Sequence, residues 1–466
     1  MLLDRYEPDP RFWAIIEQLA LEMEPELAQI DKILEDDELF QLIKKDLAQR
    51  HPHTLETGRN STPVEVGLRM LAVKRLYQYP YRGTEHHVGD SLVLRWFCRV
   101  YFNPVPDYTT LNRFALEIKP ETLHAFNERV TKLATELKVT RGRKLRTDGT
   151  VVASKIAYPR DSKLLNDGVR VLSRVIKQAK ELVEDQVEGA AASLRDRTRS
   201  ARQQARQIAN YARQRSGKAK AGLQGAYQRL IKTTQASVQQ AQRVLSVLKR
   251  QSSGTAARIG AELETFIPRV EQALDQTVRR VLQGESVPAK EKILSLFEPH
   301  VDIICRGKAG KETEFGHKVW LDEVEGGIVS QWRVLEGNPA DDQQWQPALD
   351  HHLKQFEKPP DLASADRGVY SPDNEAYAHQ KGVKRVVLPK PGYKSKERRE
   401  YEAQSWFKRG RRFQAGVEGR ISVAKRKHGL DCCLDHGQDG FDKWVGWGII
   451  ANNLTVMGRT LAAKAA

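Results

Sequence analysis

One carboxylate stands inside a strongly basic stretch near the C-terminus. Between Ser405 and Gly429 the chain has eight Lys and Arg residues and a single acid, Glu418. On a helix, Lys425 and Arg411 lie two turns to either side of Glu418 and on the same face. Glu418 therefore has two interpretations: a metal ligand held where nucleic-acid phosphates arrive, or a carboxylate paired with the cations of a basic helix. The stretch by itself favours the second interpretation.

Two aspartates far from this stretch have the same chemistry. Asp148 lies in the middle of an alternating, β-branched segment, and Asp366 ends a short apolar segment. Three carboxylates suffice for two Mg²⁺ ions ~3.5–4 Å apart, with Mn²⁺ as a substitute, because Mg²⁺ takes few carboxylates and completes its shell with water and phosphate. One ion would activate the attacking water or 3′-hydroxyl, and the other would stabilise the leaving oxygen. We expect the clustered carboxylates to repel one another without the metal.

The elements that must position these acids follow a mixed α/β pattern. We expect a two-stranded hairpin over residues 144–159, with Asp148 projecting from the sheet if Leu145 and Val151 face a core. Functional side chains gather at the carboxyl ends of parallel strands, which is where Asp366 is expected. The other expected elements are strands after Pro299 with a hairpin turn at Gly326-Gly327, a helix over 341–356, a strand ending at Asp366, a helix over 371–380, a strand over 383–389, and a C-terminal helix that caps the core.

Charge is distributed unevenly along the 466 residues, whose net charge is +16. Residues 1–50 have thirteen acids and six Lys and Arg, a balance of −7, so the remainder has +23 (16 + 7) available for a polyanion. Residues 195–251 alone have fourteen Lys and Arg and one acid. Apolar residues of the surrounding segment, 168–298, repeat at helical spacing. We expect Pro268 to kink or break one of these helices. We interpret this insert as a clamp along a phosphate backbone rather than a solvated arm.

The N-terminal third reads as helices throughout. Pro63 opens one strong helix, and Asp107 is the expected N-cap of another, over 109–118. A helix, a short turn and a helix bearing Arg113 are compatible with a helix-turn-helix DNA reader, and equally with an ordinary helical bundle. The four cysteines have no zinc or disulfide spacing, and no run approaches the ~18 apolar residues of a membrane span, so we expect a reduced, cytoplasmic setting.

The sequence also resembles a known family. The segments TDGTVVASKIAYPRDSKLLNDGVRVL, ADRGVYSPDNEAYAHQKGVKRVVLPKPG and AGVEGRISVAKRKHGL closely resemble DDE transposases of bacterial insertion sequences, in particular the ISNCY group. STPVEVGLRMLAVKRLY and DSLVLRWFCRVYFNPVPDYTTLNRF are similar to the helical N-terminal domain of those proteins. The resemblance implies an α/β ribonuclease-H-like catalytic core with a helical N-terminal domain and a large helical insert. The corresponding boundaries are 1–135 for the N-terminal domain, 136–167 and 299–466 for the core, and 168–298 for the insert.

The resemblance also assigns residue roles. Asp148, Asp366 and Glu418 would be the catalytic, metal-binding triad, and Lys425 would contact DNA near the reacting phosphate. Arg411, Arg420 and Arg113 are further candidates for DNA contact. The chain departs from the related Tyr-Arg-Glu-Lys signature, because Arg411 stands in the Tyr position and Gln414 in the Arg position. Glu418 follows Asp366 by only 52 residues (418 − 366), whereas 218 residues (366 − 148) separate the two aspartates.

The expected activity is that of a transposase that binds terminal inverted repeats, cuts the DNA and joins the freed 3′-hydroxyl to target DNA. The expected partners are double-stranded DNA, for both element ends and target, and a second copy of the chain in at least a dimer. Two alternatives stay open. One is a structure-selective DNA nuclease on the same core, and the other is a non-catalytic DNA-binding protein that uses the basic insert alone.

Overall fold

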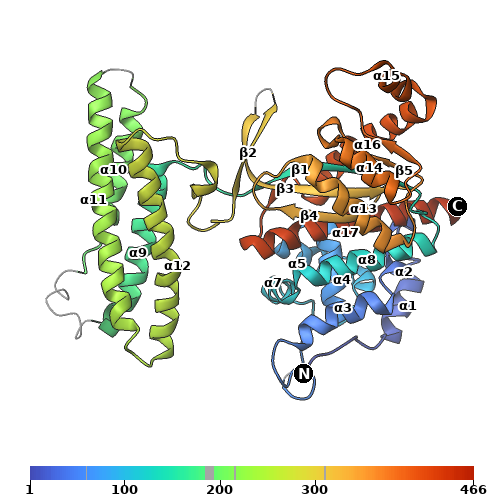
Figure 1. Ribbon diagram of the computed structural model, residues 1–466. Helices are drawn as coiled ribbons and strands as arrows, with labels where there is room; N and C mark the ends of the chain where they lie inside the picture. Colours follow the sequence, from blue (N-terminus) through green and yellow to red (C-terminus); the bar gives the residue numbers. More distant parts are fainter. Residues whose placement is uncertain (59, 184–193, 215–216, 309–310, 466) are drawn as a thin grey trace. The chain divides into compact units, whose positions relative to one another are not determined.

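The computed structural model describes residues 1–466 except 59, 184–193, 215–216, 309–310 and 466. It divides into two compact units (Figure 1): Met1–Lys155 together with Arg306–Ala466, and Ile156–Cys305. The first unit contains the expected N-terminal domain and most of the expected core segments, whereas residues 156–167 and 299–305 of those segments belong to the second unit. The second unit, called the insert unit below, encloses the expected insert of residues 168–298.

Helices make up the N-terminal part of the first unit. They are α1 (Pro10–Gln18), α2 (Pro25–Ile33), α3 (Asp37–Ala48), α4 (Val64–Leu76), α5 (Tyr81–Asp90), α6 (Leu92–Phe97), α7 (Tyr108–Glu117) and α8 (Pro120–Glu136). The expected cap of α7 is confirmed, since the Asp107 side chain accepts hydrogen bonds from the backbone N–H groups of Thr109 and Thr110, both at 2.9 Å. Helix α4 begins directly after Pro63 and is buried along nearly its whole length. It is therefore the central helix of this part of the core.

A mixed sheet forms the other half of the same unit. Its strands are β1 (Lys144–Ser154), β3 (Lys311–Val324), β4 (Ile328–Leu335), β5 (Leu362–Ser364), β6 (Arg385–Val387) and β7 (Cys432–Cys433), while β2 (Asp302–Lys308) crosses the boundary between the units. Strand β1 pairs antiparallel with β3 and parallel with β5 and β7; β4 is antiparallel to β3, and β6 is parallel to β5. The protein is thus a mixed α/β protein that is mostly helical.

One expectation about this sheet is wrong. Residues 144–159 do not form a hairpin, because Lys144–Ser154 is a single strand whose antiparallel partner is β3, more than 150 residues further along the chain. Gly149 does not turn the strand; it faces Trp320, whose ring would lie 3.1 Å from an added Cβ. The expected turn between β3 and β4 is confirmed, with Gly326 at φ +88° and Gly327 at φ +82°.

Helices cover both faces of the sheet. The helices of this part are α13 (Trp345–Phe356), α14 (Pro372–Gln380), α15 (Lys396–Ala403), α16 (Ser405–His428) and α17 (Gly437–Ala465), with 3₁₀ turns η4 (Asp341–Gln344) and η5 (Arg367–Val369). Helix α16 contacts β1, β5 and β6, and α8 and α17 contact β4. The expectation of a core-capping C-terminal helix is confirmed, since Trp444, Trp447 and Leu454 of α17 are buried in the main core.

The insert unit is a bundle of long helices with its own apolar core. Its helices are α9 (Asp161–Val183), α10 (Thr198–Tyr211), α11 (Gly217–Leu248) and α12 (Gly254–Thr277), followed by the π-helical turn η2 (Val278–Leu282) and the 3₁₀ turn η3 (Ala289–Glu291). Pro268 does not break its helix, which continues to Thr277. In the described parts of the chain, no helix is long and apolar enough to cross a membrane.

Candidate active site

Two of the three candidate acids lie on neighbouring parallel strands. Strands β1 and β5 run in the same direction, and their register pairs Arg146 with Ser364. Asp148 and Asp366 each lie two residues beyond that pair, which is the last pair of the β1–β5 register, and Asp366 precedes the 3₁₀ turn η5. Because side chains alternate along a strand, Asp148 and Arg146 point to the same face of the sheet. Asp148 is half-buried, and its Oδ1 accepts a hydrogen bond from the Gly149 backbone N–H at 2.7 Å.

The third acid comes from helix α16, which is fixed to that face by hydrogen bonds. Gln414 donates from Nε2 to the Thr147 carbonyl oxygen at 3.1 Å and accepts at Oε1 from the Ser364 hydroxyl at 3.0 Å. It thereby ties the helix to β1 and β5 at the level of the two aspartates. The Arg146 guanidinium adds a bond to the Phe413 carbonyl oxygen at 2.5 Å. Glu418 follows Gln414 by one helical turn, so it lies on the same side of the helix, and its side chain is exposed.

Glycines allow this close packing of α16 on the sheet. A Cβ added to Gly410 would come within 2.5 Å of the Val387 side chain of β6, and one added to Gly416 within 2.4 Å of the Arg146 guanidinium. Arg146 in turn pairs with the buried Glu323 of β3 at 2.6 Å. The helix that bears Glu418 is therefore held by buried contacts on both sides of the candidate site.

The electrostatics indicate that the acids affect one another. The pKa of Asp366 is raised, first by loss of hydration and then by the negative charges of Glu418 and Asp341; a hydrogen bond from Gln414 opposes the rise. Asp366 and Glu418 are thus close enough to interact. Hard carboxylate oxygens of this kind fit Mg²⁺, which would compensate their charge. Among the described residues, however, no three His, Cys, Asp or Glu side chains converge closely enough to hold a metal ion as they stand.

Asp341 is a fourth acid at this site, and the sequence analysis did not single it out. It begins η4 and forms an ion pair with Lys318 of β3. Its Oδ2 lies 3.4 Å from the position a Cβ would take on Gly368, two residues after Asp366. The Lys318 ammonium also donates to the Pro339 carbonyl oxygen at 2.9 Å. In the sequence, Asp341 could be noticed only as an acid at the start of the helix expected after a strand. Its position beside Asp366 depends on the tertiary structure.

The four basic residues expected to contact DNA differ in their surroundings. Lys425 donates to the Val151 carbonyl oxygen of β1 at 2.7 Å. Arg420 lies 3.5 Å from the buried carboxylate of Glu323 and donates to the Asn452 side chain at 3.4 Å. Arg411 and Arg113 are exposed, on α16 and α7 respectively. Lys425 and Arg420 thus form contacts within the protein, whereas Arg411 and Arg113 are exposed at the surface.

Comparison with known proteins identifies the N-terminal region. Residues 16–116 match the family model described as Transposase domain (DUF772), a stretch of 101 residues (116 − 16 + 1) that includes α2 to α6 and all but the last residue of α7. No curated protein and no solved structure matches the chain. The family match implies a transposition enzyme, and this class agrees with the resemblance noted in the sequence.

Proposed function

We propose that the protein is a DDE transposase of the insertion-sequence type, ISNCY-like, with a ribonuclease-H-like catalytic core. The observation that carries this proposal is that Asp148 and Asp366 follow the paired residues of two neighbouring parallel strands, while Glu418 lies on the helix that is hydrogen-bonded to both strands. A β1–β3–β4 antiparallel part continued by the parallel strands β5 and β6 supports the proposed core. The family match at residues 16–116 supports the proposed reaction class.

The three carboxylates would act as ligands for two Mg²⁺ ions, with Mn²⁺ as a substitute, and such ions supply activation of a nucleophile and stabilisation of a leaving oxygen. To reach such ions, Asp148 would exchange its contact with the Gly149 N–H for metal coordination. Glu418, on an exposed helical face, is free to change rotamer toward Asp366. Positioning of the DNA phosphate and compensation of its charge account for most of the catalysis in phosphoryl transfer.

The basic residues would hold the DNA. In this proposal the exposed Arg411 and Arg113 contact DNA phosphates. Before DNA binds, Lys425 and Arg420 hold α16 against the rest of the unit through their contacts with Val151, Glu323 and Asn452. The protein would bind the terminal inverted repeats of its element as at least a dimer, cut them, and join the 3′-hydroxyl to target DNA. It would act in the cytoplasm, at the chromosome.

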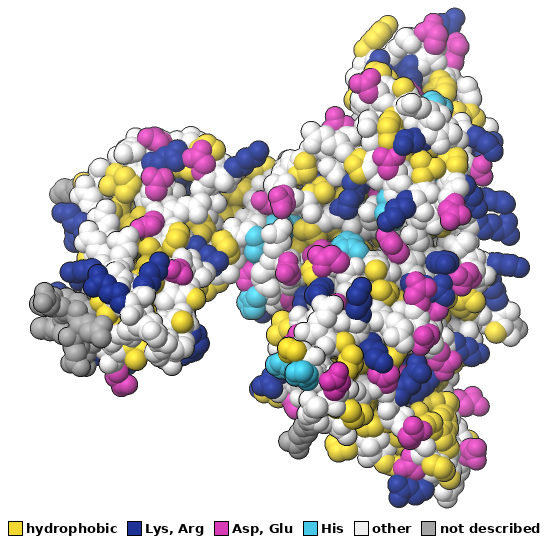
Figure 2. Space-filling view, turned by 60° about the horizontal axis from the view of Figure 1, so that its bottom comes forward, with side chains coloured by type: hydrophobic (Ala, Val, Ile, Leu, Met, Phe, Trp, Pro, Cys, Tyr) yellow, Lys and Arg dark blue, Asp and Glu magenta, His cyan; other side chains and the backbone are white. Residues whose placement is uncertain are grey.

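The insert unit offers a groove suited to the proposed clamp. A cavity of about 410 Å³ there is lined by Tyr158 and by four basic side chains, Arg160, Lys163, Arg202 and Arg206. Figure 2 shows Lys and Arg side chains exposed on this unit. Tyr158 is 69% exposed, so its ring is accessible beside these cations. Cations beside an exposed aromatic ring are the chemistry that binds a nucleic-acid backbone and stacks on its bases.

The decisive test is substitution of the aspartate on β1. Asp148→Asn should lower Mg²⁺-dependent cleavage of element-end DNA by at least about 100-fold, a loss of about 2.7 kcal/mol or more of transition-state stabilisation, and leave DNA affinity unchanged. Asp373→Asn, an exposed acid on α14, is the matched control and should cut normally. Undiminished cleavage by Asp148→Asn would refute the assignment. A strand-transfer assay with a precut end separates a transposase from a structure-selective nuclease, which would cut without joining.

A further inference from the structure

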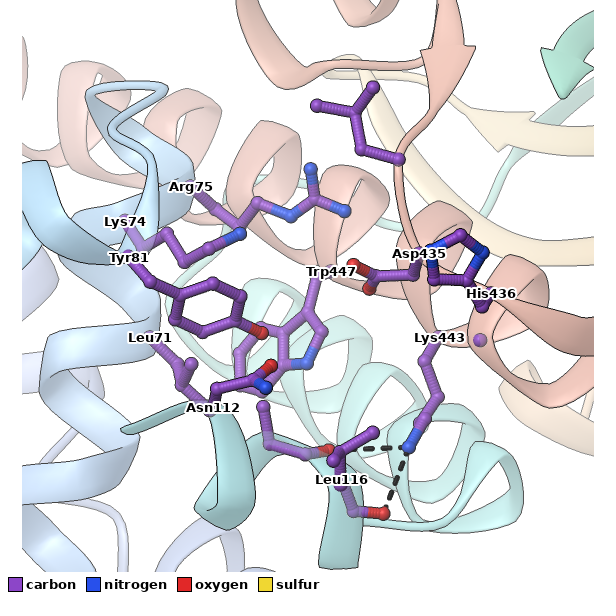
Figure 3. A pocket seen from close by; sticks show the side chains of 13 residues that line it. Leu71, Lys74, Arg75, Tyr81, Asn112, Leu116, Asp435, His436, Lys443 and Trp447 are labelled. Carbon is purple, nitrogen blue, oxygen red and sulfur yellow. Dashed lines mark hydrogen bonds between the residues drawn. The ribbon is translucent and has the colours of Figure 1, made fainter. Parts of the chain in front are cut away.

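A second cavity lies within the first unit, between N-terminal helices and the segment that leads into α17. Its volume is about 360 Å³, and its walls include Lys74 and Arg75 of α4, Tyr81 of α5, and Asp435 and Lys443 on the opposite side. Figure 3 shows Lys74 and Arg75 extending side by side toward Asp435. An adjoining cavity of about 570 Å³ shares Lys74, Arg75, Tyr81 and Asp435. Volumes of this size are typical of sites for small ligands.

Two cations are buried in this wall. Lys74 is only 8% exposed and Arg75 only 6%. The Arg75 guanidinium lies 3.8 Å from the centroid of the Trp444 ring and donates to the Trp444 carbonyl oxygen at 2.5 Å. The Lys74 ammonium lies 4.4 Å from the centroid of the Tyr81 ring. Throughout the described part of the chain, no side chain or carbonyl forms a hydrogen bond or ion pair with that ammonium.

The charges around this cavity are not balanced. Asp435 attracts both cations, but it lies beyond ion-pair distance of either one in the described structure. Lys443 adds a third cation, whose ammonium donates to the Ala115 and Leu116 carbonyl oxygens at 3.2 and 3.0 Å. Burial and the neighbouring Arg75 lower the pKa of Lys74 to about 8, and burial lowers the pKa of Arg75 to about 10. Among the described residues, Asp435 is the one carboxylate that lines this cavity with Lys74, Arg75 and Lys443, while Asp439, Glu117 and Asp46 also attract Lys443. Lys74 and Arg75 are thus two buried cations that share one carboxylate, and a bound anion would improve this charge balance.

We propose that this cavity binds a phosphate group, held by the Lys74 ammonium and the Arg75 guanidinium. An arginine presents a fork of donors that fits phosphate oxygens, and a lysine adds a compact charge. The adjoining cavity is also lined by Lys425. Lys425 lies on α16, two helical turns after Glu418, so the same helix contributes to the phosphate site and to the candidate active site. We assign the phosphate to the backbone of a bound DNA strand; this assignment rests on the proposed function, whereas phosphate binding by itself does not.

Thermal unfolding of the purified full chain tests phosphate binding directly. Inorganic phosphate should raise the unfolding midpoint of the natural protein by a few degrees relative to chloride at the same ionic strength. Lys74→Met removes the charge and keeps the length of the side chain. This variant should unfold at the same or a higher temperature in chloride, because an unpaired buried charge is gone, and it should not respond to phosphate. Lys132→Met, an exposed lysine on α8, is the matched control and should keep the phosphate response.

Two results would overturn phosphate binding: an equal midpoint of the natural protein in phosphate and chloride, or a full phosphate response in Lys74→Met. A lower midpoint of Lys74→Met in chloride would instead assign Lys74 a structural role and contradict the argument from unpaired charge. Lys74→Arg, which keeps the charge, should retain most of the phosphate response.

A second arm identifies the source of the phosphate. If a DNA strand supplies it, Lys74→Met should bind short duplex DNA several-fold more weakly than the natural protein, and inorganic phosphate should compete with DNA. If DNA affinity is unchanged while the phosphate response is lost, the site binds a free phosphate compound and the assignment to DNA is wrong. Neither measurement depends on cleavage, so failure here is distinct from failure of the Asp148→Asn test.

Discussion

At the scale of single residues, Asp366 is the most informative side chain of the candidate active site. Its raised pKa means that the folded protein disfavours the ionised carboxylate, chiefly through lost hydration and the charges of Glu418 and Asp341. Asp366→Asn should therefore raise the unfolding midpoint in metal-free buffer at pH 7, by about 1–2 °C, since an exposed charge contact contributes below ~1 kcal/mol. The same substitution should reduce the further rise that millimolar Mg²⁺ produces in the natural protein.

Differential scanning calorimetry with and without Mg²⁺ measures both effects. Asp373→Asn replaces an exposed acid of α14 that does not contribute to the raised pKa of Asp366, so it should show neither change. An undiminished Mg²⁺ response in Asp366→Asn would exclude Asp366 as a metal ligand.

The lowered pKa of Lys74 predicts how the stability of the protein depends on pH. Its folded-state pKa of about 8 is below the ~10.4 of an unfolded lysine, so between these values the unfolded chain binds more protons and stability rises with pH. Compared with the natural protein, Lys74→Met lacks this gain. Its stability advantage should be greatest below pH 8 and should shrink as pH rises toward 10. Arg75, Tyr81, Lys443 and Asp435 are present in both proteins, so the difference in stability reports the charge of Lys74 together with its effect on these neighbours. Urea unfolding at pH 7 to 10 checks this, and a constant difference would contradict it.

At the scale of elements, Gln414 decides how α16 lies on the sheet. It is 6% exposed and bonds to both β1 and β5. Gln414→Leu should lower the free energy of unfolding by ~1–3 kcal/mol, because the Ser364 hydroxyl and the Thr147 carbonyl lose a partner in a buried place. Cleavage should fall more than stability alone explains, because Glu418 follows by one turn. Chemical denaturation and a cleavage assay measure the two effects. Gln380→Leu, at the exposed end of α14, is the control; equal losses in both variants would refute the positioning role.

The sequence predicts single elements better than it predicts their pairing. The Asp107 cap, the Gly326-Gly327 turn and the strand before Asp366 follow from local chemistry, and all are confirmed. The hairpin expected over residues 144–159 was wrong because its alternation is equally compatible with one long strand, and the partner strand β3 lies beyond the insert. The sequence did not indicate Asp341 as a site residue, again because its neighbours come from distant parts of the chain. Its place beside Asp366 depends on tertiary packing of η4 against η5, which no local pattern reveals.

At the scale of the whole molecule, the basic insert is the largest feature that the candidate active site does not explain. Deleting residues 190–255 would remove the fourteen Lys and Arg residues of the segment 195–251. The structure argues against so large a deletion, since α10 and α11 contribute Ile208, Leu230 and Val244 to the core of the bundle. Removing them would expose the apolar faces of α9 and α12, and any loss of binding would then have two causes. Neutralising charges on the bundle surface avoids this ambiguity.

Arg160, Arg202 and Arg206 are exposed and line one groove, so the triple change to Gln should leave the bundle folded. If each contacts a phosphate, the slope of log K against log salt for duplex DNA should become shallower by about 2.7, at ~0.9 per contact. Fluorescence anisotropy at 50 to 300 mM KCl measures this slope. Three exposed cations of the other unit, Arg50, Lys132 and Lys358, provide the control triple change. A similar loss of slope in both triple variants would mean that general charge attracts the DNA. An unchanged slope in the insert variant would remove the clamp from the mechanism, while the acids of the candidate active site would keep their own test.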